Sequence, residues 1–208
     1  MQTQINLDVI RNHTVSDYEY KDILKDLKVD GLKSSTVDIL DTLENLGIKD
    51  FLWLLRHLED EKSVSNLTVD FAFDCAERAV IVYEKKYSSN TPRKTLDLAK
   101  KLFSDGKEPE DWRFLNKSIA TAHDSAFLAY RCPSDSYDIN IDIDVAAASA
   151  KTCSYAGEVV RAFFFSTYHP EIQEKAWYAS NCAIEASGDS SKEEIEKQKQ
   201  NLRDKFNA

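Results

Sequence analysis

Asp74, Glu77 and His123 are the side chains of this sequence best suited to acid–base chemistry. Asp74 and Glu77 are three residues apart, so they share one face of a helix. A pair of carboxylates and an imidazole can transfer protons together in general acid–base catalysis. No spacing rule links His123 to the two carboxylates. A small helical enzyme that uses these three residues is therefore kept as an alternative, and no residue is assigned as catalytic.

Basic residues follow the two carboxylates along the chain. Arg78 comes directly after Glu77, and Arg93 and Lys94 stand at the start of the next predicted helix. Opposite charges at the junction of two helices favour ion pairs. We therefore expect Asp74, Glu77, Arg93 and Lys94 to be mainly structural and to join the two helices.

The sequence lacks the common metal-binding and nucleophile motifs. The histidines show no H-x-x-x-H spacing, and the four cysteines form no C-x-x-C pair. The alternating acidic residues from Asp138 onward resemble a calcium-binding EF-hand loop. However, Ile143 stands where that loop needs glycine, and Ser149 stands where it needs glutamate. We expect no metal, no cofactor and a reduced chain in the cytoplasm.

Composition argues against several classes of protein. The chain has 208 residues, of which 27 are basic and 36 acidic, and its net charge is −9. A negative field repels nucleic-acid phosphates, so we expect no direct nucleic-acid binding. Five glycines and four prolines are too few for β-sandwiches or phosphate-binding loops. The longest apolar runs, 145–148 and 162–165, are too short to span a membrane, and no signal peptide is expected.

Capping residues and apolar side chains at helical spacing predict an all-α multi-helix bundle. Three short helices are expected over residues 16–59. A polar linker at 60–66 and a long helix over 67–86 should follow. Further helices are predicted to begin near Thr91, Pro109, Asp144, Pro170 and Ser190.

These elements divide the chain into three parts. A small N-terminal helical subdomain is expected at 1–62 and a larger helical domain at 66–187. A charged C-terminal helix at 190–208 should lie on the surface or meet a partner. One segment, 137–145, breaks the helical pattern, because isoleucines alternate there with acidic or amide residues. This period of two predicts a strand-like or irregular insertion.

The same segment is the candidate partner-binding surface. No basic residue lies between Arg131 and Lys151, so the acidic charge there is uncompensated. Such a surface steers a basic partner, and aromatic residues supply contact area at binding hot spots. The candidate contact residues are Asp135, Tyr137, Asp138, Asp142, Asp144 and Trp53.

Three motifs carry a resemblance to a known family: D-C-A-E-R at 74–78, Y-E-K-K-Y at 83–87 and P-R-K at 92–94. Alanine-rich helices with a histidine, A-T-A-H at 120–123, follow them. Together they resemble the Imm5-type immunity protein domain, which also occurs in phage proteins, over roughly residues 66–187. Two features depart from the family pattern: the turn at 88–90 lacks acidic residues, and the segment 137–145 resembles an insertion.

The resemblance implies a non-catalytic all-α protein that binds and inhibits a toxin, an effector or a host-defence complex, such as a nuclease. It transfers no catalytic residues. It implies action inside a bacterial cell or a phage-infected host, and the uncompensated acidic segment separately predicts a protein target with a basic surface. One alternative is a phage anti-defence protein that mimics nucleic acid and occupies a basic cleft; the other is the small helical enzyme above.

Overall fold

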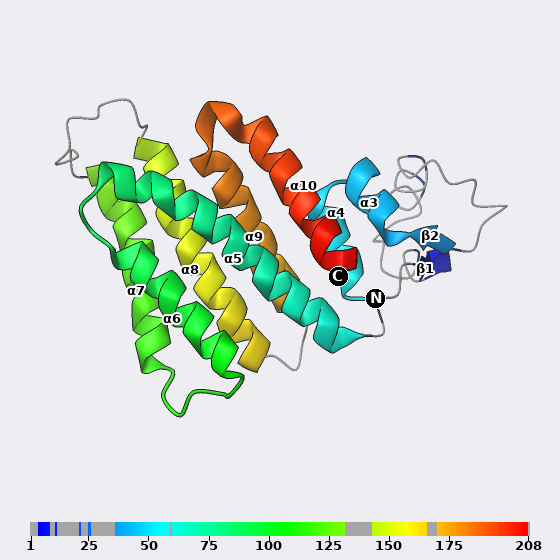
Figure 1. Ribbon diagram of the computed structural model, residues 1–208, viewed down its shortest axis with the longest axis horizontal. Helices are drawn as coiled ribbons and strands as arrows, with labels where there is room; N and C mark the ends of the chain where they lie inside the picture. The colour runs from blue at the N-terminus through cyan, green and yellow to red at the C-terminus, as the bar shows by residue number, and fades with distance from the viewer. Residues whose placement is uncertain are drawn as a thin grey trace.

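The computed structural model describes residues 4–8, 11, 21, 25, 36–58, 60–131, 143–165 and 170–207. Within these ranges it contains eight α-helices and one short two-stranded sheet, so the prediction of an all-α multi-helix bundle is confirmed. Long helices lie side by side in a bundle, and the short N-terminal elements pack at one end of it (Figure 1). None of the helices in these ranges is long and apolar enough to cross a membrane.

The longest helix, α5 (Glu61–Lys86), begins earlier than the sequence predicts. Residues 60–66 are not a linker but the cap and first turns of this helix. The carboxylate of Asp60 accepts a hydrogen bond from the Ser63 amide at 3.0 Å and so satisfies one free donor at the helix start. The polar composition of this stretch reflects an exposed first turn, because burial begins at Val64.

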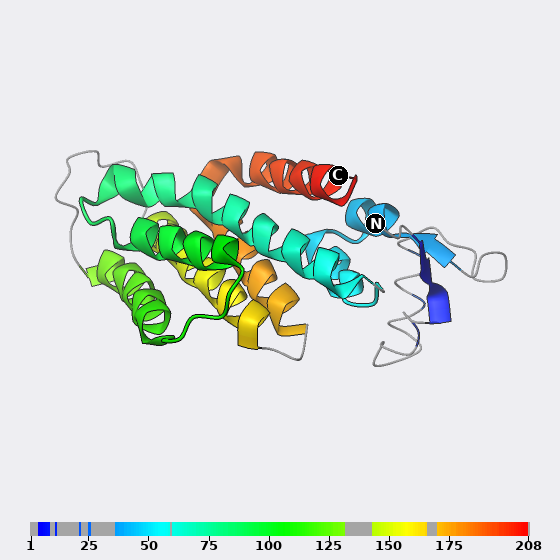
Figure 2. The ribbon, with the colours of Figure 1, turned by 60° about the horizontal axis from the view of Figure 1, so that its bottom comes forward.

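Helix α8 (Ile143–Phe165) is the central element of the bundle. It contacts α5, α6 (Thr91–Asp105), α7 (Arg113–Arg131) and α9 (Pro170–Ala186), as two views show (Figures 1 and 2). Small side chains allow this close approach, and most of them are fully buried. At Gly157 a Cβ atom would lie 2.8 Å from Cγ1 of Ile119 on α7, so only glycine fits without a shift.

Buried hydroxyl groups on α8 bond to the neighbouring helices. Ser149 donates to the Ala79 carbonyl and accepts from the Tyr83 amide at 3.2 Å, both on α5. Ser154 donates to the Ile119 carbonyl on α7 at 3.3 Å. A central helix with polar side chains on several faces is therefore tolerated, because these hydroxyls are satisfied.

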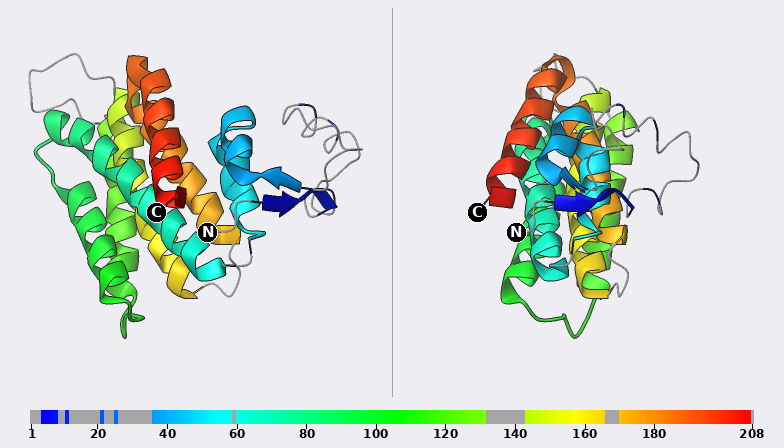
Figure 3. Two further views of the ribbon diagram at one scale, coloured as in Figure 1. Left: turned by 45° about the vertical axis from the view of Figure 1, so that its right-hand side comes forward. Right: turned by 90° about the vertical axis from the view of Figure 1, so that its right-hand side faces the viewer.

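The N-terminal part contains a small sheet that the sequence did not predict. Strands β1 (Gln4–Asn6) and β2 (Thr36–Asp38) pair antiparallel, with Ile5 opposite Val37. Helices α3 (Ile39–Asn45) and α4 (Ile48–Leu55) follow, and Asp38 caps α3 by accepting from the Leu40 amide at 2.9 Å. These elements form one end of the molecule (Figure 3), and their apolar residues belong to the same buried cluster as those of the bundle. The first predicted helix, from residue 16, lies largely outside the described residues.

The last helix, α10 (Ser191–Asn207), follows a short 3-10 turn (Gly188–Ser190) and packs on the bundle. It lies along α5 and α9 and reaches α3 (Figure 2). Its buried face has a spacing of four and contains Glu194, Gln198, Leu202 and Phe206. The sequence predicted only a charged helix that lies on the surface or meets a partner, because a buried glutamate and glutamine are not recognised as core residues.

The strand-like insertion predicted at 137–145 is only partly described. Residues 137–142 lie outside the described ranges, and residues 143–145 form the beginning of α8. The start predicted near Asp144 thus agrees with the observed helix to within one residue.

Candidate functional site

Glu77 on α5 joins α6 through two ion pairs. Its carboxylate accepts from Arg93 Nη1 and from Lys100 Nζ, each at 2.5 Å. Arg93 also binds Glu84 on α5, with its Nε 2.9 Å from Oε1. Partial burial alone would raise the pKa of Glu77, but hydrogen bonds from Lys100 and Arg93 outweigh it and hold this pKa below its usual value. These ion pairs join α5 and α6, the two helices that carry the motifs at 74–78, 83–87 and 92–94.

The other residues of the predicted cluster lie elsewhere. Asp74 faces α10, where it accepts from Asn201 Nδ2 at 2.8 Å and from Lys205 Nζ at 2.9 Å. Lys94 is exposed, and His123 is exposed on α7. The structure therefore does not bring His123 together with Asp74 and Glu77, because the three side chains face different surroundings.

Arg78 points to the last helix instead of α6. Its guanidinium contacts both carboxylate oxygens of Glu194, the closest at 2.9 Å. The Glu194 side chain is 8% exposed and also accepts from Gln198 Nε2 at 2.9 Å. Gln198 in turn bonds to the hydroxyl and carbonyl of Ser180 on α9. The result is a buried polar network that connects α5, α10 and α9.

The described cysteines have no nucleophilic character. Cys75, Cys153 and Cys182 are free and buried. Burial raises the pKa of all three thiols, that of Cys182 to about 12, so they stay protonated at neutral pH. No group of three or more histidine, cysteine or acidic side chains in the described ranges is arranged to hold a metal ion.

The predicted partner-binding residues are described only in part. Asp135, Tyr137, Asp138 and Asp142 lie outside the described residues. Asp144 is exposed in the first turn of α8. Trp53 lies on α4, where it borders a pocket between α4 and α9.

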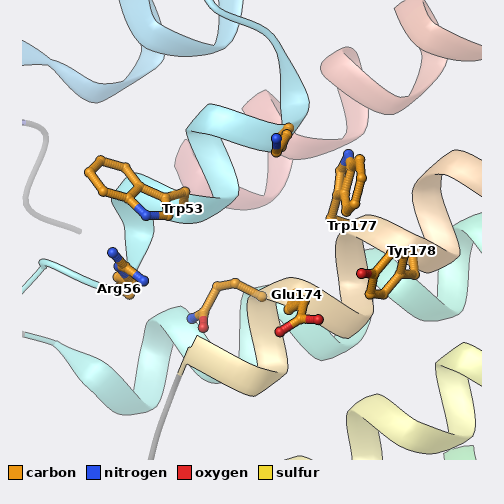
Figure 4. A pocket seen from close by; sticks show the side chains of 7 residues that line it. Trp53, Arg56, Glu174, Trp177 and Tyr178 are labelled. Atoms are coloured by element: carbon orange, nitrogen blue, oxygen red, sulfur yellow. The ribbon is translucent and has the colours of Figure 1, made fainter. Parts of the chain in front are cut away.

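This pocket, called here the α4–α9 pocket, has a volume of about 250 Å³. One helix face forms each side of the pocket. The lining residues on α4 and just after it are three or four positions apart, and those of α9 are one or three positions apart, so each set lies on a single face of its helix. Trp53 and Arg56 lie on one side, and Glu174, Trp177 and Tyr178 on the other (Figure 4). The lining residues are Lys49, Trp53, Arg56, Gln173, Glu174, Trp177 and Tyr178.

Charged and aromatic neighbours hold the rings of the pocket in place. Arg56 lies over the Trp53 ring at 4.6 Å, and Lys49 reaches across from α4 to lie 5.3 Å from the Trp177 ring centre. Tyr178 stacks on Tyr155 of α8, with ring centres 5.3 Å apart. The pocket therefore consists of preformed aromatic walls with charges of both signs at its mouth.

Gln173 is the unusual residue of the α4–α9 pocket. The residue is only 3% exposed, yet neither atom of its side-chain amide has a hydrogen-bond partner within the described part of the chain. Buried polar groups in proteins are nearly always bonded, because an unmet donor or acceptor costs about 1–3 kcal/mol. The Gln173 amide is therefore an unsatisfied hydrogen-bonding group beside the α4–α9 pocket.

Sequence reasoning singled out Trp53 but missed the rest of the pocket. Its signals are faint: Trp53 lies off the apolar stripe of its helix, and Trp177 and Tyr178 flank the inward alanines of α9. Only the packing of α4 on α9 brings these two faces together. No periodicity in the sequence relates segments that are so far apart.

Comparisons with known proteins add no relative. No protein-family model matches this chain, and neither a curated protein nor a solved structure matches it. The Imm5-type resemblance of residues 66–187 therefore stays a prediction.

Proposed function

We propose that the protein acts by binding another protein, as a non-catalytic inhibitor of the immunity type that neutralises a toxin, an effector or a host-defence complex. The observation that carries this proposal is the composition of the α4–α9 pocket. Tryptophan, tyrosine and arginine are the residues most enriched at interface hot spots. Here two tryptophans, one tyrosine and one arginine border the same pocket.

The site is also physically suited to recognition. Its rings are half-buried and fixed by stacking and by cations, so little side-chain entropy is lost when a partner binds. The enzyme alternative is not supported by the packing, because Asp74 bonds to α10, Glu77 bonds to α6, and His123 is exposed on α7. The proposed setting is the cytoplasm of a bacterial cell or of a phage-infected host.

Replacing Trp177 by alanine tests the proposal. The tagged protein is first used to capture partners from its native host, and each captured protein is then purified and titrated by calorimetry. The Trp177→Ala variant is expected to bind at least about 30-fold more weakly, as hot-spot truncation typically costs 2 kcal/mol or more.

Phe114→Ala is the matched control. Phe114 is 73% exposed on α7 and lies outside the α4–α9 pocket, so its removal should leave the affinity unchanged. Equal affinity of the wild type and the Trp177→Ala variant for every captured protein would contradict the proposal.

The acidic segment yields a separate prediction about the rate of association. Changing Asp138, Asp142 and Asp144 together to asparagine should slow association about three- to tenfold at low salt, because the field that attracts a basic partner is weakened. The dissociation rate should change little. Surface plasmon resonance across a series of salt concentrations measures both rates. Unchanged association at low salt would exclude this segment as the steering surface.

A further inference from the structure

We propose that the α4–α9 pocket binds one residue of an extended peptide segment, whose main-chain N–H and C=O both pair with the Gln173 amide. The apolar side chain of that residue would pack among Trp53, Trp177 and Tyr178. This inference rests on the proposed function and specifies which part of a partner protein the pocket receives.

The first support is the hydrogen-bonding state of Gln173. A glutamine amide offers donors on Nε2 and an acceptor on Oε1 side by side. Both atoms expose almost no surface and are unpartnered in the described chain, although the residue lines the pocket, so the side chain must turn into the pocket to meet a ligand. The complementary ligand must therefore present one acceptor and one donor next to each other.

An extended peptide residue has this pattern. In a strand, the N–H and C=O of the same residue point to the same side, and a neighbouring strand bonds to both. The side-chain amide of Gln173 can form the same two hydrogen bonds that a neighbouring strand would form. Recognition of this kind takes affinity from main-chain bonds and specificity from a side-chain pocket.

The second support is the size and lining of the pocket. At about 250 Å³ it is smaller than the cavities of roughly 300–1,000 Å³ that enclose free drug-sized ligands. It suits a single side chain that is presented by a larger partner. The surrounding rings favour an apolar side chain, and the two cations and one carboxylate of the lining, Lys49, Arg56 and Glu174, leave a net charge of only +1.

The direct test uses N-acetyl-leucine N-methylamide, a probe with one apolar side chain and both main-chain groups. Its binding to the full chain is followed by the side-chain amide signals of Gln173 in ¹⁵N–¹H spectra, which are assigned by their loss in Gln173→Met. The expected result is a saturable shift of these signals with a Kd of about 1 mM, as befits a ligand of this size.

Two further probes separate the chemistries. The leucine probe methylated on both nitrogens keeps its carbonyls but has no N–H, and it should bind at least about fivefold more weakly. Adenosine offers a planar base in place of a peptide. The proposal is overturned if the methylated probe binds as tightly, if adenosine alone shifts the signals, or if no probe moves them, in which case water satisfies the amide.

A matched pair of glutamines tests the role of Gln173 in the free protein. Gln173→Met removes an unsatisfied buried amide, so Tm should rise by about 2–4 °C while probe binding is lost. Gln198→Met removes an amide that bonds to Ser180 and Glu194, so Tm should fall by about 4 °C or more. A fall in Tm for Gln173→Met would mean that its amide serves folding and would overturn the proposal.

The outcomes also separate this inference from the proposed function. If a captured partner binds Gln173→Met as tightly as the wild type but loses affinity for Trp177→Ala, only the peptide-recognition inference fails. If the leucine probe binds as expected but no captured protein depends on Trp177, only the proposed protein partner fails.

Discussion

Changing Arg78 to methionine should lower the free energy of unfolding by about 3 kcal/mol. The variant leaves the Glu194 carboxylate buried between α10 and the bundle without its cation. Removing one partner of a buried ion pair typically costs 3–5 kcal/mol, and the lower end applies because the Arg78 side chain is 31% exposed. Urea unfolding followed by circular dichroism measures the loss.

Two further variants serve as controls for the effect of burying Glu194. Arg93 also forms an ion pair between helices, but its carboxylate partners Glu77 and Glu84 are 36% and 35% exposed, so Arg93→Met should cost less than about 1 kcal/mol. Adding Glu194→Gln to Arg78→Met removes the stranded charge and should restore most of the stability. Equal losses for Arg78→Met and Arg93→Met would show that burial of Glu194 does not matter.

A leucine in place of Gly157 should destabilise the bundle by about 3 kcal/mol or more. The first added carbon would already lie 2.8 Å from Ile119 Cγ1, closer than carbon atoms pack, so Ile119 or the whole of α7 must move away from α8, whereas Thr95 Cγ2 on α6 would be at an ordinary contact distance of 3.6 Å. The gain in helix propensity over glycine, about 1 kcal/mol, is too small to offset this. Thermal unfolding by calorimetry measures the effect.

Shortening Ile119 tests whether its side chain causes the clash. The double variant Gly157→Leu with Ile119→Ala should be more stable than the sum of the two single losses, because the new side chain fills the space left by isoleucine. Ala120→Leu on the exposed side of α7 is the control and should stay within about 0.5 kcal/mol of the wild type. Strictly additive losses would argue against a direct contact of residues 119 and 157.

The sequence predicts the bundle well because its signals are local. The proline after Thr91 and the left-handed Gly106 mark the two ends of α6, and the helix begins at Thr91 as predicted. The sheet of β1 and β2 was missed because it joins two three-residue strands that are distant in the sequence, and neither shows a pattern of its own. The polar start of α5 was mistaken for a linker because exposed first turns and loops have the same composition.

The candidate site was much harder to predict. Trp53 drew attention as an aromatic residue off the apolar stripe, but nothing local marks Gln173 as buried and unpartnered. Sequence reasoning paired Asp74 and Glu77 because they are three residues apart, yet one contacts α10 and the other α6. Two neighbouring helices, α6 and α10, pack beside this face of α5, and only the packing determines which of the two each side chain contacts.

The position of α10 has a consequence for how the protein folds during synthesis. The ring of Phe206 lies 6.1 Å from that of Phe51, and Arg203 bonds to Glu44 across 159 residues of chain. Although α8 and α9 cover most of α5, the part of the core around Phe51 therefore remains open until residues 191–207 have been synthesised. Contacts between such distant segments slow folding and expose intermediates to aggregation. Helices α6 to α9 can form their local contacts before α10 has been synthesised, but the core around Phe51 is complete only when α10 has docked.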